Sequence, residues 1–320
     1  MDHRNLITMK YLVFALIVFS IVTSLSGAAE SDRPVKRARP PKWPEEVRRV
    51  FFDDAREKLV GTRPTYDAEQ VAGSVKAEST PKIAAESGDA TWSTLIDAEA
   101  IETEVKRLAE AVANDVTTPS EFKGGAFKEC RRDFSTLAMF FAIAAQYDGY
   151  VRWKDAAPAL RDAFARAGAN CKVGTDQTFQ EATQRKQDLA DLIRGSRPEA
   201  TRAERTTDWS QIADRSPLME RLNIAHQDRL MRWLANERQF EQHRDDIRHE
   251  AQVVAAIADV IAREGYDYWD DDQYAAYARE LRQAAIDATA AAEHDNYDQA
   301  RQAIDRATKA CADCHDGYRE

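Results

Sequence analysis

Two cysteines and a histidine near the C-terminus are the residues best suited to do chemistry. They form the segment Cys311-Ala312-Asp313-Cys314-His315, and on a helix the two thiols and the imidazole would share one face, since they stand at i, i+3 and i+4. The spacing Cys-x-x-Cys-His is the attachment signal for c-type haem. It predicts one haem c per chain, with two thioether bonds and His315 as the proximal iron ligand.

Other chemistry is less consistent with this segment. A zinc site needs four ligands, and the sequence has no second Cys-x-x-Cys or Cys-x-x-His. A redox dithiol usually lies at a helix start, where the positive end of the dipole stabilises a thiolate, whereas these cysteines close a long helical segment. A plain disulfide would not need His315. Haem attachment is therefore the favoured interpretation.

The end of the chain resembles that of a class II c-type cytochrome, the cytochrome c prime group. The resemblance covers about residues 209–320 and depends on the motif at 311–315, followed by Asp316-Gly317-Tyr318-Arg319. It implies a four-helix bundle whose last helix carries the haem, with His315 as fifth iron ligand and Arg319 near a haem propionate. Arg319 as a solvated terminal residue stays an equal alternative. The resemblance also implies maturation outside the cytoplasm and homodimers formed through the first two helices, a surface that an extra repeat could occupy instead.

The sixth iron position has one candidate, Met219. The inward stripe of the first helix of this unit carries residues at steps of three and four, namely Met219, Leu222, His226, Leu230 and Trp233. In an up-and-down bundle the start of the first helix lies beside the end of the fourth, so Met219 would be level with the haem. An ordinary core methionine is the alternative. His226 lies about 10 Å further along the axis and is interpreted as a core-edge residue; His243, His249 and His294 are expected at the surface.

The elements that must position these residues are four helices. In the second unit the first is expected from a Ser216-Pro217 start to about residue 235, and the second over about 240–264. Acidic residues 270–272 favour the start of the third, and Asn296 can cap the fourth. The sequence predicts an all-α protein built of up-down-up-down four-helix bundles.

A second copy of this pattern precedes the first. Trp92-Ser93 recurs as Trp209-Ser210 after 117 residues, and Leu160-Arg161 recurs as Leu281-Arg282 after 121. Residues 91–196 are therefore expected to form a haem-less repeat, because Leu189-Ala190-Asp191-Leu192 stands where the cysteines would be. Heavier inward side chains could fill the volume that haem would take; they are Phe134, Leu137, Phe140, Phe141 and Ile143.

The remaining cysteines, Cys130 and Cys171, both lie in this first repeat. In an exported protein two spare cysteines often pair, so a disulfide is the favoured prediction. Two buried free thiols are the alternative.

The N-terminus has the order of a secretory signal. A basic start, an apolar run from Tyr11 to Leu25 and small residues to Ala29 predict a signal peptide over about 1–28, with a periplasmic or otherwise exported product. The run is short for a membrane span, which wants roughly 20 residues, so an uncleaved membrane anchor is the minor alternative. Residues 29–90 are expected to be a proline- and basic-rich linker with a flexible segment.

Composition limits the function. A net charge of −10 argues against nucleic-acid binding, and a low mean hydropathy argues against a polytopic membrane protein. Residues 209–320 carry −9 and residues 91–195 carry −2. Such a charge can steer the haem unit toward a basic redox partner, and solubility alone is the alternative that the charge favours. No nucleophile–base constellation or phosphate loop indicates an enzyme. Electron transfer is the leading hypothesis; nitric oxide or carbon monoxide binding at five-coordinate haem, and a non-redox docking scaffold, are the alternatives.

Overall fold

The computed structural model describes residues 91–196 and 208–318, all within one compact unit. Over these two ranges the chain forms helices and no strand, which confirms the all-α prediction. None of the helices in these ranges is both long and apolar enough to cross a membrane. The predicted signal peptide and linker, residues 1–90, lie outside the described residues.

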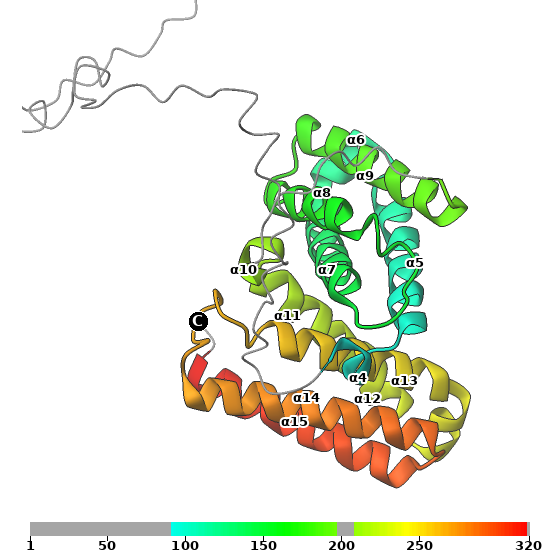
Figure 1. The fold of residues 1–320 in the computed structure, drawn as a ribbon, viewed down its shortest axis with the longest axis vertical. Coiled ribbons are helices and arrows are strands. Elements are labelled where there is room, and N and C mark those ends of the chain that lie inside the picture. The colour runs from blue at the N-terminus through cyan, green and yellow to red at the C-terminus, as the bar shows by residue number, and fades with distance from the viewer. Residues whose placement is uncertain (1–90, 197–207, 319–320) are drawn as a thin grey trace, which may run out of the picture. The chain divides into compact units, whose positions relative to one another are not determined.

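The first half of the described chain, residues 91–196, begins with a short turn of helix and continues with four longer helices (Figure 1). Its elements in order are α4 (Trp92–Leu95), α5 (Ala98–Asp115), α6 (Pro119–Glu121) with the π-helical segment η3 (Phe122–Ala126), α7 (Phe127–Gln146), α8 (Ala157–Asn170) and α9 (Asp176–Arg194). Local chemistry sets the ends of α9. The Thr175 side chain accepts from the Thr178 N–H as an N-cap, and Gly195 ends the helix at φ 86°, a left-handed conformation that glycine adopts without strain.

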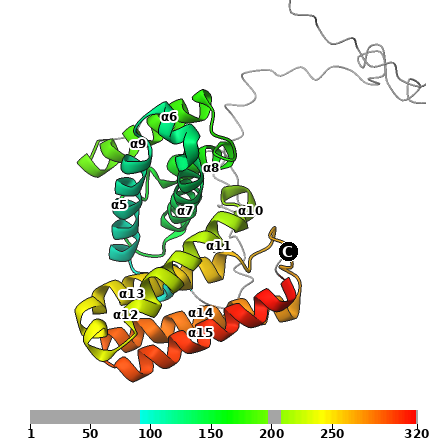
Figure 2. The ribbon, with the colours of Figure 1, turned by 180° about the vertical axis from the view of Figure 1, so that it is seen from behind.

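The second half, residues 208–318, repeats this order. Its elements are α10 (Trp209–Ile212), α11 (Arg215–Asn223), the π-helical segment η4 (Ile224–Leu230), α12 (Met231–Trp233), α13 (Glu237–Val260), α14 (Asp272–Glu293) and α15 (Tyr297–Tyr318). The helix pairs α13–α14 and α14–α15 pack along most of their length, and α14 and α15 run side by side in both ribbon views (Figures 1 and 2).

The predicted start of the first helix of this half is wrong by two residues. Asp214 is the N-cap of α11 and Ser216 already lies inside the helix, because Arg215 takes helical geometry before the proline. The other caps follow the sequence. The Asp271 side chain accepts from the Gln273 and Tyr274 N–H groups, and Asn296 accepts from the Gln299 N–H at 3.0 Å.

The two halves repeat a contact as well as an order of helices. The Tyr147 hydroxyl donates to the Ile96 carbonyl at 3.1 Å, and the Tyr266 hydroxyl donates to the Ala213 carbonyl at 2.8 Å. Ile96 and Ala213 are 117 residues apart, the offset of the Trp-Ser pairs. In each half a buried tyrosine thus fixes the short first helix to the loop before the third long helix.

The cores of the halves differ in side-chain size. In the first half, Phe164 of α8 lies between Phe134 and Phe141 of α7, with ring centroids 5.8 and 5.5 Å apart. The predicted inward residues of α7 are all buried, as expected. In the second half the residues of α13 equivalent to those inward side chains are alanine, valine and isoleucine, and Ala285 stands at the position equivalent to Phe164.

Candidate functional site at the end of α15

The Cys-x-x-Cys-His motif occupies the last turns of α15. Cys311 is partly buried and packs against the hydrophobic core, Cys314 is partly buried, and His315 is exposed. Burial raises the pKa of the Cys311 thiol to about 11 and also raises that of Cys314, so both are protonated at neutral pH. The motif therefore has two neutral, partly buried thiols on the core-facing side of α15 and an accessible imidazole beside them.

Three tyrosines surround Tyr318, the last residue of α15. The ring of Tyr318 lies 5.1 Å from that of Tyr268 and 5.5 Å from that of Tyr274, with Tyr277 at 6.4 Å. The Tyr318 hydroxyl donates to Asp271 Oδ1 at 2.7 Å, the same oxygen that caps α14. Edge-to-face rings and one hydrogen bond thus hold the end of α15 against the start of α14.

Arg215, the first residue of α11, lies beside the motif. Its guanidinium is 5.5 Å from the Tyr268 ring centroid and is held by Asp267 at 3.0 Å. The same guanidinium lies 5.9 Å from the Tyr274 ring centroid, and the Tyr274 ring packs against Tyr318 at the end of α15. The starts of α11 and α14 and the end of α15 therefore meet at one place.

The predicted distal residue lies one helical turn after Arg215. Met219 is partly buried and packs against the core, which suits both a ligand role and a core methionine, so its role stays a prediction. His226 is partly buried and its Nε2 is 2.7 Å from Thr308 Oγ1, which agrees with a core-edge histidine. Arg319, the predicted propionate partner, lies outside the described residues.

One histidine was misplaced by the sequence. His294 is exposed and His243 is partly exposed, but His249 is buried, with 7% of its surface accessible. Its charged sequence neighbours suggested a surface position. The structure instead brings it against Glu104 of the first half, 145 residues away, a partner that local sequence could not show.

The corresponding end of α9 lacks this chemistry. Leu189 and Leu192, at the positions of the motif cysteines, are buried with 1% and 2% of their surface accessible. Cys130 and Cys171 are buried free thiols in the structure, and the disulfide stays a prediction. Burial raises the pKa of both thiols.

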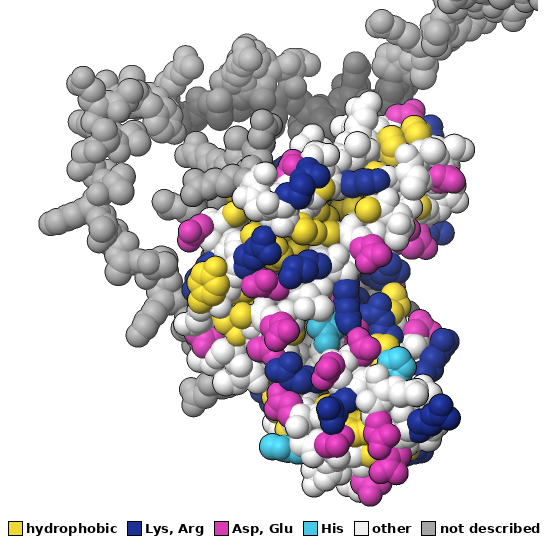
Figure 3. Space-filling model, turned by 90° about the vertical axis from the view of Figure 1, so that its right-hand side faces the viewer, with side chains coloured by type: hydrophobic (Ala, Val, Ile, Leu, Met, Phe, Trp, Pro, Cys, Tyr) yellow, Lys and Arg dark blue, Asp and Glu magenta, His cyan; other side chains and the backbone are white. Residues whose placement is uncertain are grey.

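A shallow apolar groove also belongs to the first half. It runs between α5 and α9 and is lined by Lys106, Ala109, Glu110, Ala113, Lys186, Ala190 and Ile193. On the face drawn in Figure 3, hydrophobic side chains gather in the upper part among basic ones, whereas charges of both signs are mixed below. The groove contains none of the motif residues, so it forms no part of the α15 site.

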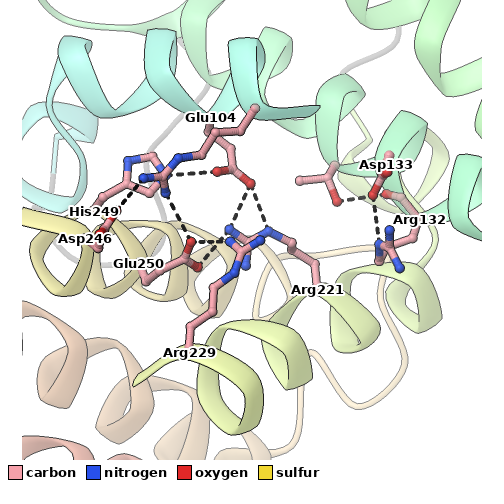
Figure 4. Close-up of polar contacts among 10 residues, drawn as sticks. Glu104, Arg132, Asp133, Arg221, Arg229, Asp246, His249 and Glu250 are labelled. Carbon is pink, nitrogen blue, oxygen red and sulfur yellow. Dashed lines mark hydrogen bonds and ion pairs between the residues drawn. The ribbon is translucent and has the colours of Figure 1, made fainter. Parts of the chain in front are cut away.

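A second cluster of ionisable side chains is buried where α5, α11 and α13 meet (Figure 4). Arg221 Nη2 lies 2.8 Å from Glu104 Oε1 and 2.8 Å from Glu250 Oε2, and His249 Nε2 lies 2.9 Å from Glu104 Oε2. None of the four side chains exposes more than 7% of its surface. Burial opposes ionisation of Glu104, but the charge of Arg221 and the hydrogen bond from His249 hold its pKa well below the usual range.

This cluster has the spacing of a metal site. Glu104, His249 and Glu250 offer ligand atoms within 4.8 Å of one another. However, guanidinium groups already neutralise the carboxylates; they belong to Arg221, Arg107 and Arg229. A divalent cation would lie next to three fixed positive charges, so we interpret the cluster as an ion-pair network between the halves. One feature of the sequence is related to this network: Glu104 and Arg221 are 117 residues apart and so occupy equivalent positions in the two repeats.

The chain matches no protein-family model, no curated protein and no solved structure. Its function therefore has to be inferred from the residues themselves. Among the described residues, the end of α15 brings together two thiols, an accessible imidazole and a cluster of tyrosine rings.

Proposed function

We propose that this protein is an exported c-type cytochrome that carries one covalent haem c at the end of α15 and transfers electrons. The described helices would then be two tandem four-helix bundles, of which the second is similar to a class II cytochrome. The observation that supports this most is the motif itself, with Cys311 and Cys314 on the inner side of the last turns of a long helix and His315 next to them.

The residues at this end fit such a group. Each neutral thiol would add its S–H across one vinyl group, and the His315 imidazole, which is exposed, would bind the iron. When bound, the haem iron supplies one-electron transfer between its ferric and ferrous states. The aromatic rings of Tyr268, Tyr274 and Tyr318 would provide an apolar wall, and the Arg215 guanidinium a counter-charge for a propionate.

Electron transfer, rather than gas binding, depends on Met219. A thioether at the sixth position would leave small ligands no vacancy and would keep the coordination unchanged on reduction. Met219 supports this because it lies one turn after Arg215, whose guanidinium is 5.5 Å from the Tyr268 ring beside the end of α15. A net charge of −9 on residues 209–320 favours a basic partner protein.

The test is a spectrum of the protein matured in a host that attaches haem outside the cytoplasm. We expect one haem per chain, a sharp low-spin band after reduction, and colour that acidified acetone does not extract. Cys311→Ser combined with Cys314→Ser should abolish covalent attachment, and Cys130→Ser is the matched control that should keep it. A colourless control protein, or haem that acetone extracts, would refute the proposal.

Met219→Ala separates the two haem functions. We expect it to convert the low-spin spectrum to a high-spin one that takes up carbon monoxide rapidly. An unchanged spectrum would remove Met219 as a ligand. A high-spin spectrum in the unaltered protein would favour gas binding over electron transfer.

A further inference from the structure

Two ion pairs between the halves are reciprocal. Arg248 of the second half pairs with Asp97 of the first at 2.5 Å, and Arg131 of the first half pairs with Asp214 of the second at 2.9 Å. Asp97 and Asp214 are 117 residues apart, and so are Arg131 and Arg248. Each aspartate also takes a second donor from the opposite half, in one case Gln252 and in the other Lys172.

Two further pairs join residues that are equivalent to each other. The rings of Trp92 and Trp209 lie 5.4 Å apart, and Glu104 pairs with Arg221. In a two-fold interface, exchanged contacts come in equal pairs, and a residue that meets its own equivalent lies on the axis. The halves are thus related as the two subunits of a symmetric dimer, with the tryptophan pair and the Glu104–Arg221 pair on the axis.

We propose that the first half is a built-in partner subunit, which covers the α11–α13 face of the second half and excludes a second copy of the chain from it. This pairing does not depend on haem. It gives a role to the repeat that lacks the Cys-x-x-Cys-His motif, because α5 and α7 of the same chain then cover the α11–α13 face.

The Glu104–Arg221 pair, here called the axis pair, makes the association of a first half with a second half selective. The Arg221 guanidinium meets a carboxylate of the first half, and the Glu104 carboxylate also accepts from His249. In a dimer of two first halves, two buried Glu104 carboxylates would instead face each other. Two second halves would oppose two buried Arg221 guanidiniums and leave His249 without its acceptor. Like charges at a buried axis disfavour both alternatives, so the opposite charges at positions 104 and 221 select the mixed pair.

The experiment uses the full chain with a protease site placed within residues 197–207. An affinity tag is put on the C-terminus of one preparation, which is mixed with an untagged one, and both are cleaved and left to exchange. We expect the tagged second half to retain one first half and no untagged second half, at the mass of a single chain by sedimentation. Separated fragments, or recovery of untagged second halves, would overturn the proposal.

Glu104→Arg tests the axis pair directly. It would oppose two guanidiniums within the mixed pair, so the cleaved halves should separate, while Glu104→Gln should retain them with weaker association. Glu280→Arg is the matched control, the same change on an exposed residue of α14, and should leave the pair intact. Circular dichroism before cleavage reports whether each variant folds. If folded Glu104→Arg halves stay paired as tightly as the control, the axis pair does not select the partner.

Discussion

The ends of α9 and α15 occupy equivalent places in the two halves and differ in what their inner faces carry. At the end of α9, Leu189 and Leu192 are fully buried in a core that contains Phe164. At the end of α15, Cys311 and Cys314 are only partly buried, and alanine takes the place of that phenylalanine. Large apolar side chains fill the core of the first half, whereas the second half has small residues beside two partly buried thiols.

The largest expected effect comes from placing the leucines of the first half at the two cysteine positions of the second half. Cys311→Leu with Cys314→Leu should abolish covalent haem entirely, because no sulfur is left to form a thioether, while the helices persist. Haem stoichiometry per chain and circular dichroism measure the two effects. Covalent haem in this variant would show that attachment lies elsewhere in the chain.

Next in size is the loss of the first half's large core residue. Phe164→Ala should lower the free energy of unfolding by about 3–5 kcal/mol, since it removes a fully buried ring and leaves a cavity. Denaturant unfolding measures this. Ala163→Gly on the same helix is a milder comparison, expected to cost about 1 kcal/mol. Equal losses would mean that the phenylalanine cluster does not determine the stability of this half.

The network between the halves should respond to pH. Glu104→Gln should lower the stability at neutral pH by about 1–3 kcal/mol, because Arg221 loses a charged partner. The pKa of Glu104 is lowered in the folded state, so its contribution is present above the unfolded pKa, about 4.3, and is lost as the pH falls toward the folded value. The gap between variant and parent should therefore shrink in acid; a constant gap would contradict this.

The smallest effect is expected at a second buried carboxyl of the first half. Burial raises the pKa of Asp133 despite its hydrogen bond from Arg132. A raised pKa means that its ionisation opposes folding, so stability falls as the pH rises through this pKa. Asp133→Asn should therefore raise the melting temperature at neutral pH and change it little at low pH. A lower melting temperature at neutral pH would show that the ion pair with Arg132 outweighs burial.

The sequence predicted the parts of this structure that depend on local patterns. Apolar spacing and capping residues such as Asn296 and Asp271 placed the helices, and α7 buried the side chains expected of it. What could not be predicted depends on contacts between residues far apart in the chain. His249 was expected at the surface because its sequence neighbours are charged, yet its partner Glu104 comes from the other half. The same limit applies to Arg215, whose position beside Tyr274 and the end of α15 follows from how the helices meet.

One oxygen at the chemical end of the molecule serves two elements. Asp271 Oδ1 accepts from the Gln273 and Tyr274 N–H groups and from the Tyr318 hydroxyl. The end of α15 can therefore leave the start of α14 when this hydroxyl contact, worth about 0.5–1.5 kcal/mol, and the ring contacts of Tyr318 break, while α14 keeps its cap. The end of α15 can thus separate from α14 without unwinding the first turn of α14.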